Sequence, residues 1–149
     1  GIMAFAEKHH CELLLPIDIV VAERAEPGAP ARTRALGQLD DGERILDAGP
    51  ATVDRLTRAM DEAKTLIWNG PLGVFEIPPF DKGTMAAARH AAALAKAGRL
   101  VAVAGGGDTV AALHQAGVAG DFTFVSTAGG AFLEWMEGKT LPGVAALDS

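Results

Sequence analysis

The sequence predicts an α/β fold, a doubly wound, Rossmann-like parallel sheet with helices on both faces that is incomplete at the amino end. Short runs rich in Val, Ile, Leu and Ala alternate with segments of helical periodicity along most of the chain. Glycine-rich turns join several of these runs to the helices that follow them, which is typical of βαβ units. The 149 residues, 49% hydrophobic and 21% charged, are enough for one domain with a buried core.

The first third of the chain is less regular. Residues 2–8 carry apolar side chains at helical spacing and are expected to be the end of an amphipathic helix. Residues 12–16 and 18–22 are apolar runs that are expected to be buried strand, divided by a proline step. Residues 23–42 are polar and contain Pro and Gly, so we expect a loop with one short edge strand near 34–36.

From residue 44 onward, strands and helices are expected to alternate. The expected strands cover residues 44–48, 65–68, 100–104 and 121–126. The expected helices cover residues 52–64, 82–97, 108–116 and 131–137. Pro50 suits the first turn of a helix, and Gly98 is placed to end the 82–97 helix. Residues 69–79, with two glycines and three prolines, are expected to form a long loop.

The balance of charge argues against polyanionic partners. The formal net charge is -6 and the pI about 5.1, so no basic surface is expected for nucleic acid or an anionic membrane. The longest apolar stretch, 13–22, contains Pro16 and Asp18 and is unsuited to spanning a bilayer. Cys11 is the single cysteine, which excludes an intrachain disulfide and suits a cytoplasmic protein.

The amino end predicts a truncated product. The chain starts at Gly1 and its first residues already have the pattern of the middle of a helix. Loss of earlier strands would leave a sheet edge and an apolar face uncovered. We therefore expect the isolated chain to self-associate or to be only marginally stable.

The strongest local motif is the turn after the 100–104 run. Three glycines, Gly105 to Gly107, are followed by Asp108 and Thr109 at an expected helix start. Glycines allow close approach of the backbone to a ligand, and the free amides of a helix start attract phosphate. A carboxylate beside them could hold Mg²⁺, which prefers oxygen ligands shared with phosphate. The alternative is a tight strand-to-helix turn in which Asp108 is only the N-cap.

A similar turn follows the next strand. Ser126 and Thr127 precede Gly129 and Gly130, and another helix is expected to begin there. Because successive parallel strands end at the same edge of a sheet, the two turns together would form a two-sided anion cradle. Either turn taken alone could be purely structural.

The loop after the 65–68 strand offers polar groups of another kind. Asn69 could bond a ligand, and Glu76 could accept hydrogen bonds from hydroxyls such as those of a ribose. The alternative is a loop that is simply packed by Trp68 and Phe75. No catalytic base or Cys/His metal cluster stands out in the sequence, which is compatible with phosphoryl transfer because that chemistry depends mainly on positioning and charge neutralisation.

These stretches, in this order, resemble phosphoglycerate kinase. The matching segments are 15–22, 46–50, 68–76, 105–109 and 126–143. The resemblance implies a two-domain enzyme that transfers a phosphoryl group between 1,3-bisphosphoglycerate and ADP, giving 3-phosphoglycerate and ATP in glycolysis. Residues 1–149 would be part of the carboxyl-terminal domain that binds Mg²⁺ and ATP or ADP. The amino-terminal substrate domain would be absent, the isolated fragment inactive and the full-length enzyme a monomer.

The resemblance also implies individual roles. Asp108 is similar to the family's metal–nucleotide ligand, and Gly129, Gly130 and Thr127 lie where the transferring phosphoryl group is steadied. The implied nucleotide contacts are Leu46, Asn69, Pro71, Glu76, Gly105, Gly106, Gly107 and Thr109. Two residues depart from the family pattern: Ile45 and Ala128 stand where glycine is common.

A different class of function is a non-catalytic α/β module that binds a nucleotide or a partner protein. An open reading frame that starts at Met3 would favour that module. A reading frame that runs far upstream would favour the kinase.

Overall fold

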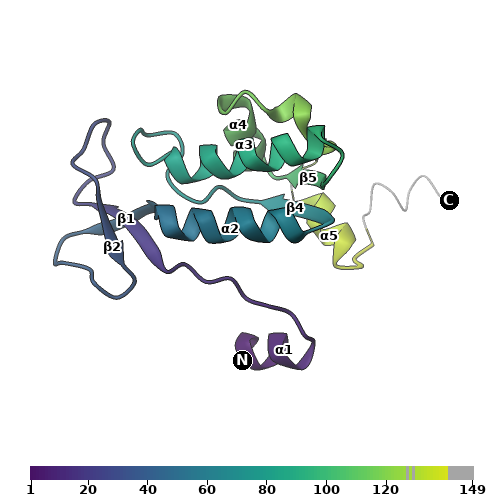
Figure 1. Ribbon diagram of the computed structural model, residues 1–149, viewed down its shortest axis with the longest axis horizontal. Helices are drawn as coiled ribbons and strands as arrows, with labels where there is room; N and C mark the ends of the chain where they lie inside the picture. Colours follow the sequence, from purple (N-terminus) through teal and green to yellow (C-terminus); the bar gives the residue numbers. More distant parts are fainter. Residues whose placement is uncertain (127, 129, 141–149) are drawn as a thin grey trace.

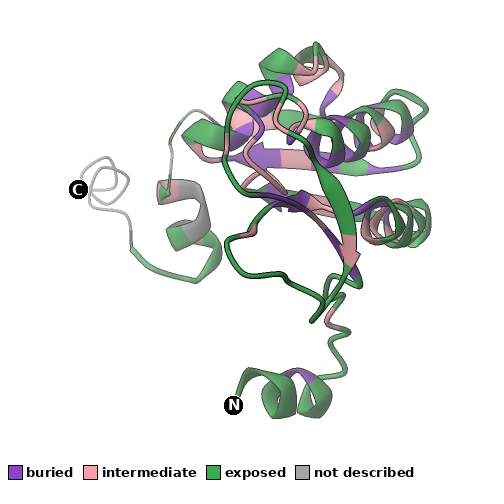
Figure 2. Cartoon of the chain, turned by 90° about the vertical axis from the view of Figure 1, so that its left-hand side faces the viewer, coloured by how far each residue is buried: buried purple, intermediate pink, exposed green. Residues whose placement is uncertain are grey.

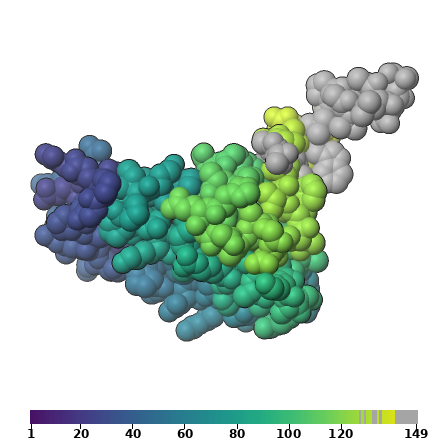
Figure 3. Space-filling model, turned by 90° about the horizontal axis from the view of Figure 1, so that it is seen from above, coloured from purple at the N-terminus to yellow at the C-terminus, as the bar shows by residue number. Residues whose placement is uncertain are grey.

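The computed structural model describes residues 1–126, 128 and 130–140 (Figure 1). The helices are α1 (Ile2–Lys8), α2 (Pro50–Glu62), α3 (Lys82–Lys96), α4 (Gly107–Gln115), the short 3-10 helix η1 (Ala119–Asp121) and α5 (Ala131–Met136). The strands are β1 (Asp18–Ala22), β2 (Arg32–Ala35), β3 (Arg44–Ala48), β4 (Thr65–Asn69), β5 (Val101–Gly105) and β6 (Phe124–Ser126). The amino-terminal residues form one end of the molecule and the last described residues lie at the other (Figure 3).

The centre of the fold is a parallel sheet in the order β4-β5-β6. Helices α2 and α3 lie on one side of it and α5 on the other, as the view in Figure 2 shows. The predicted α/β class, with a parallel sheet flanked by helices, is therefore confirmed. The predicted helix and strand boundaries after residue 44 are correct to within two residues except at β6. There the structure forms η1 first, so the strand is shorter than the expected 121–126.

Small side chains bring α3 close to the sheet. Ala87, Ala88 and Ala91 on the helix and Ala102 and Ala104 on β5 are all fully buried in one core cluster. Because alanine adds little bulk, the helix backbone can approach the strands closely while the interior stays densely packed. The Ala-rich composition of this helix is thus explained by its position over β5.

A second sheet, in the order β2-β1-β3, is antiparallel. The predicted strand 44–48 exists with those bounds as β3, but it pairs with β1 and lies outside the parallel sheet, so its expected place in the strand–helix alternation was wrong. An apolar run indicates that a strand is buried and does not indicate which strand it pairs with or in which direction. The predicted edge strand near 34–36 is confirmed as β2, shifted by one or two residues.

The expected strand at 12–16 is wrong. These residues are extended without strand pairing, and the side chain of Leu15 is 54% exposed. A strand requires a partner for its backbone N–H and C=O groups, and the described residues place none beside this run. The segment links β1 to α1, which stands away from the two sheets in Figure 1.

One face of the parallel sheet is incompletely covered. Ile67 is paired in register with Val103, and Val103 with Phe124, so these three side chains share a face; Val101 lies two residues before Val103 on the same side. Ile67, Val101 and Phe124 are 41%, 47% and 55% exposed, whereas the opposite face is buried under α3. This is the apolar face that the sequence predicted. No helix among the described residues is long and apolar enough to cross a membrane.

Two aspartates on the antiparallel sheet fix the helices that follow. Asp18, at the start of β1, accepts hydrogen bonds from the amide of Ala51 at 2.9 Å and from the amide and hydroxyl of Thr52 at 2.7 and 2.6 Å. Burial opposes ionisation of this carboxyl, but the bonds from Thr52 and Ala51 outweigh it and lower its pKa. Asp18 therefore serves as an N-terminal cap for α2 supplied by a distant strand.

Candidate functional site

The carboxyl ends of the three parallel strands meet at one edge of the sheet. The pairing aligns Asn69 with Gly105 and Gly105 with Ser126, so the last residues of β4, β5 and β6 lie side by side. Ligands of open α/β sheets bind at this edge because the strand-to-helix loops converge there. Three of the predicted site segments, separated by more than twenty residues each in the sequence, are thus brought together.

The turn from β5 to α4 has the geometry expected of an anion site. Gly106 has φ +93, which disfavours any residue with a side chain, and an added Cβ would lie 3.1 Å from Oδ1 of Asn69. The first intrahelical bond of α4 runs from the amide of Val110 to the carbonyl of Gly106, at 3.0 Å. The amides of residues 107–109 therefore lack intrahelical acceptors and carry the positive end of the helix dipole.

Asp108 lies in the first turn of α4 and is exposed. The N-cap residue is Gly106, so the structure rules out the alternative in which Asp108 is only the N-cap. Within the described residues there is no cluster of three His, Cys, Asp or Glu side chains that could hold a metal. The fit is to a cation such as Mg²⁺, which takes one carboxylate from a protein and completes its shell with phosphate oxygens and water.

Thr109 is 2% exposed, and its hydroxyl oxygen accepts a hydrogen bond from the amide of Gly70 at 2.7 Å. The hydroxyl thus anchors the loop after β4 to the start of α4, and its hydrogen is still able to donate to a ligand. The indole of Trp68 donates to the carbonyl of Gly70 at 2.6 Å. The beginning of this loop is therefore tied to both β4 and α4.

The remainder of the 69–79 loop combines both alternatives weighed from the sequence. Trp68 and Phe75 are buried at 7% and 4% exposure, so the loop is indeed packed by its aromatic residues. Asn69 and Glu76 are nevertheless exposed, and Pro71 is half-buried. The packing thus holds the loop while leaving its polar side chains open to a ligand.

Leu46 lies on β3 at 7% exposure, in a cluster with Ala22 and Phe80. Its carbonyl accepts a hydrogen bond from the amide of Val74 at 2.8 Å, which joins the second sheet to the 69–79 loop. The side chain expected to line a base pocket is therefore part of the core. Its connection to the site passes through its backbone.

The second predicted turn is only partly described. Ser126 is 5% exposed, and its Oγ accepts a hydrogen bond from the amide of Ala128 at 3.3 Å. Gly130 precedes α5, and its carbonyl accepts from the amide of Glu134 at 3.0 Å. Thr127 and Gly129 lie outside the described residues.

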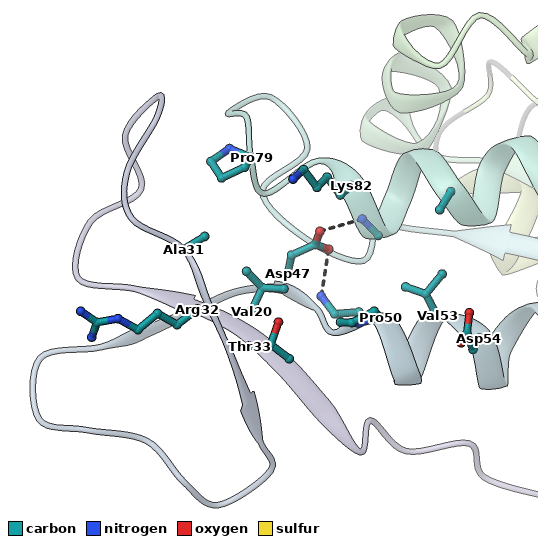
Figure 4. Close-up of a pocket in the computed structure, with 13 residues that line it drawn as sticks. Val20, Ala31, Arg32, Thr33, Asp47, Pro50, Val53, Asp54, Pro79 and Lys82 are labelled. Carbon is teal, nitrogen blue, oxygen red and sulfur yellow. Dashed lines mark hydrogen bonds between the residues drawn. The ribbon is translucent and has the colours of Figure 1, made fainter.

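Asp47 is a residue that the sequence did not single out. It is 2% exposed, and its carboxylate accepts hydrogen bonds from the amide of Gly83 at 2.7 Å and from its neighbour Ala48 at 2.8 Å (Figure 4). Burial raises its pKa to about 6, against the lowering effect of these bonds. Gly83 is in the first turn of α3, so Asp47 caps that helix from β3 as Asp18 caps α2 from β1.

The cavity beside Asp47 is separate from the predicted site. It encloses about 430 Å³ between the antiparallel sheet and the starts of α2 and α3, and its lining includes Val20, Pro50 and Lys82 (Figure 4). None of the residues predicted to bind a ligand lines it. The described residues therefore place the candidate site at the open edge of the parallel sheet, and a deep pocket lies elsewhere.

The raised pKa of Asp47 predicts a specific pH dependence of stability. In the folded protein this carboxyl keeps its proton up to about pH 6, and in the unfolded chain it loses it near its model value of 3.8. Its contribution to the free energy of unfolding is therefore fully present below about pH 4 and is lost as the pH rises through about 6. The stability of the parent relative to Asp47→Asn should fall over this window.

Urea unfolding of both proteins at several pH values checks this prediction. The effect of Asp18 does not interfere, because its lowered pKa changes stability only at more acidic pH. A difference between parent and Asp47→Asn that stays constant from about pH 4 to pH 7 would show that burial does not perturb Asp47.

Comparison with known proteins adds the family. The model of the family described as phosphoglycerate kinase matches residues 1–139. Phosphoglycerate kinases of Caulobacter vibrioides strain NA1000 and of Zymomonas mobilis are 66% and 61% identical over 148 and 149 residues, 99% and 100% of this chain. The chain spans 37% and 38% of those two relatives, a little over a third of their length.

Solved structures of the same family share the fold. The phosphoglycerate kinase of Coxiella burnetii superimposes with a TM-score of 0.87 at 39% identity, over 96% of this chain and 36% of that one. The enzyme of Pyrococcus horikoshii gives a TM-score of 0.74 at 27% identity, over 98% of this chain and 37% of that one. The agreement covers both sheets, since nearly the whole chain is matched.

Proposed function

This chain belongs to the phosphoglycerate kinase family, and on that premise we propose that it supplies the nucleotide-binding part of an enzyme that transfers a phosphoryl group between 1,3-bisphosphoglycerate and ADP. The observation that carries the proposal is the alignment of Asn69, Gly105 and Ser126 at one sheet edge, directly before the start of α4. Free helix amides and close backbone approach are what a polyphosphate requires.

The residues at this edge divide the task of holding a Mg²⁺–nucleotide. The amides at the start of α4, with Gly105 to Gly107, receive the phosphates, and Thr109 can donate its hydroxyl to them. Asp108 supplies the protein carboxylate for Mg²⁺, which neutralises phosphate charge when bound. Asn69, Pro71 and Glu76 on the exposed part of the loop contact the nucleoside. Leu46 supports that loop from below through Val74.

The second turn completes the proposed active site. Gly129 and Gly130, with Thr127 beside them, would steady the transferring phosphoryl group with backbone amides. The only contribution asked of the protein is a fixed array of donors and one carboxylate. Phosphoryl transfer fits such a site because its rate depends on positioning and on neutralising charge.

The rest of the enzyme is part of the same proposal. Residues 1–149 form part of the carboxyl-terminal domain, and an amino-terminal domain binds 3-phosphoglycerate. The full-length protein acts in the cytoplasm as a monomer in glycolysis, and the isolated chain is inactive because one substrate has no site on it.

The test is ADP formation by the full-length protein. We expect turnover that requires 3-phosphoglycerate, ATP and Mg²⁺ together, with saturable binding of a fluorescent ADP analogue in a parallel titration. Nucleotide binding without turnover would favour the non-catalytic module. A folded full-length protein that binds no nucleotide would overturn the proposal altogether.

A further inference from the structure

Thr84 is a buried polar side chain on the otherwise alanine-rich helix α3. Its side chain is fully buried, and its Oγ1 accepts a hydrogen bond from the amide of Leu72 at 3.0 Å. Leu72 lies in the loop between Asn69 and Glu76, the two exposed polar residues assigned to the nucleoside. A threonine on a buried helix face is thus used to hold a segment of the candidate site.

The bond from Leu72 is the middle one of three. The amides of Gly70, Leu72 and Val74 donate to the Thr109 hydroxyl at 2.7 Å, the Thr84 hydroxyl at 3.0 Å and the Leu46 carbonyl at 2.8 Å. Anchors on alternate residues, from three different elements, leave the intervening backbone little freedom. The central anchor is the one for which no other backbone group substitutes.

The start of α3 is itself held firmly where Thr84 leaves it. Asp47 accepts the amide of Gly83, and an added Cβ on Gly83 would lie 2.6 Å from Oδ1 of Asp47. An added Cβ on Gly73 would overlap the same carboxylate and lie 2.6 Å from the carbonyl of Leu46. The loop and the helix therefore meet across one buried carboxylate with no space to shift.

From these contacts we infer that Thr84 is a positioning residue for nucleotide binding: without touching the ligand, it holds the 69–76 loop in the conformation that presents Asn69 and Glu76. The inference rests on the proposed function. It predicts that nucleotide affinity depends on the Thr84 hydroxyl. It also predicts that the affinity for 3-phosphoglycerate does not.

Thr84→Val in the full-length protein is the direct test, because valine keeps the shape and removes the acceptor. We expect the Kd for ADP and the KM for ATP to rise about tenfold, the effect of one buried amide left without a partner. The kcat and the KM for 3-phosphoglycerate should stay near the parent values. Thr84→Ser retains the hydroxyl and should bind ADP as the parent does.

Thr123→Val is a matched control. Its hydroxyl oxygen accepts the amide of Ala102 at 3.0 Å, the same kind of bond at the opposite end of β5. We expect it to lower the thermal midpoint as Thr84→Val does and to leave the Kd for ADP unchanged. Should Thr84→Val fail to fold, Thr84→Ala removes the same acceptor without adding bulk and carries the same expectation.

Two results would overturn the inference. Equal Kd values for ADP in Thr84→Val and Thr123→Val would show that the Thr84 bond serves stability alone. A loss of affinity in Thr84→Ser as large as in Thr84→Val would show that packing, and not the hydroxyl, matters. A parent protein that binds no ADP would instead remove the proposed function, and with it this role.

Discussion

Asp108→Ala is expected to reduce the kcat of the full-length enzyme about 100-fold, the scale on which loss of one preorganised charged group acts in such sites. Asp108 is exposed in the first turn of α4, beside amides that have no intrahelical acceptor. The substitution removes the single carboxylate assigned to Mg²⁺ while the phosphate-binding amides remain. Steady-state kinetics over a range of Mg²⁺ concentrations measures the effect.

The control for this substitution is Asp41→Ala. Asp41 is also an exposed aspartate, in the loop before β3 and outside the candidate site. It should leave kcat unchanged. Asp108→Ala should lower the thermal midpoint only slightly, since an exposed acidic residue at a helix start contributes about 0.3–1 kcal/mol. Normal activity of Asp108→Ala at every Mg²⁺ concentration would disprove the assigned role.

Gly49→Ala is expected to lower the free energy of unfolding by about 3 kcal/mol, through overpacking together with loss of a buried cap. Gly49 is the residue before α2, and an added Cβ would overlap the carboxylate of Asp18. That carboxylate accepts the amides of Ala51 and Thr52, so displacing it leaves the first turn of α2 without acceptors. Urea unfolding reports the loss.

Gly120→Ala provides the comparison. A Cβ on Gly120 would meet no atom within 4 Å, and its backbone conformation is one that alanine adopts freely. We expect its stability to match that of the parent. If Gly49→Ala were equally harmless, the cap supplied by Asp18 would contribute little to the fold.

The candidate site illustrates how far local patterns carry. Gly105 to Thr109 could be recognised from the sequence because a buried run, three glycines and a helix start are neighbours in the chain. Thr84 and Asp47 could not be recognised in the same way. One signal existed, since Thr84 is a polar residue within an alanine-rich helix, but its partner Leu72 is twelve residues away in a loop.

The sequence by itself determined the type of most elements, their approximate bounds and the glycine-rich turns, because helix and strand periodicity and turn chemistry are local properties. The tertiary structure alone decided that β3 pairs antiparallel with β1, that residues 12–16 form no strand, and that Asn69, Gly105 and Ser126 align. It also decided the pKa of Asp47. Strand pairing, register and desolvation depend on groups far apart in the chain, so they are fixed only when the chain is packed.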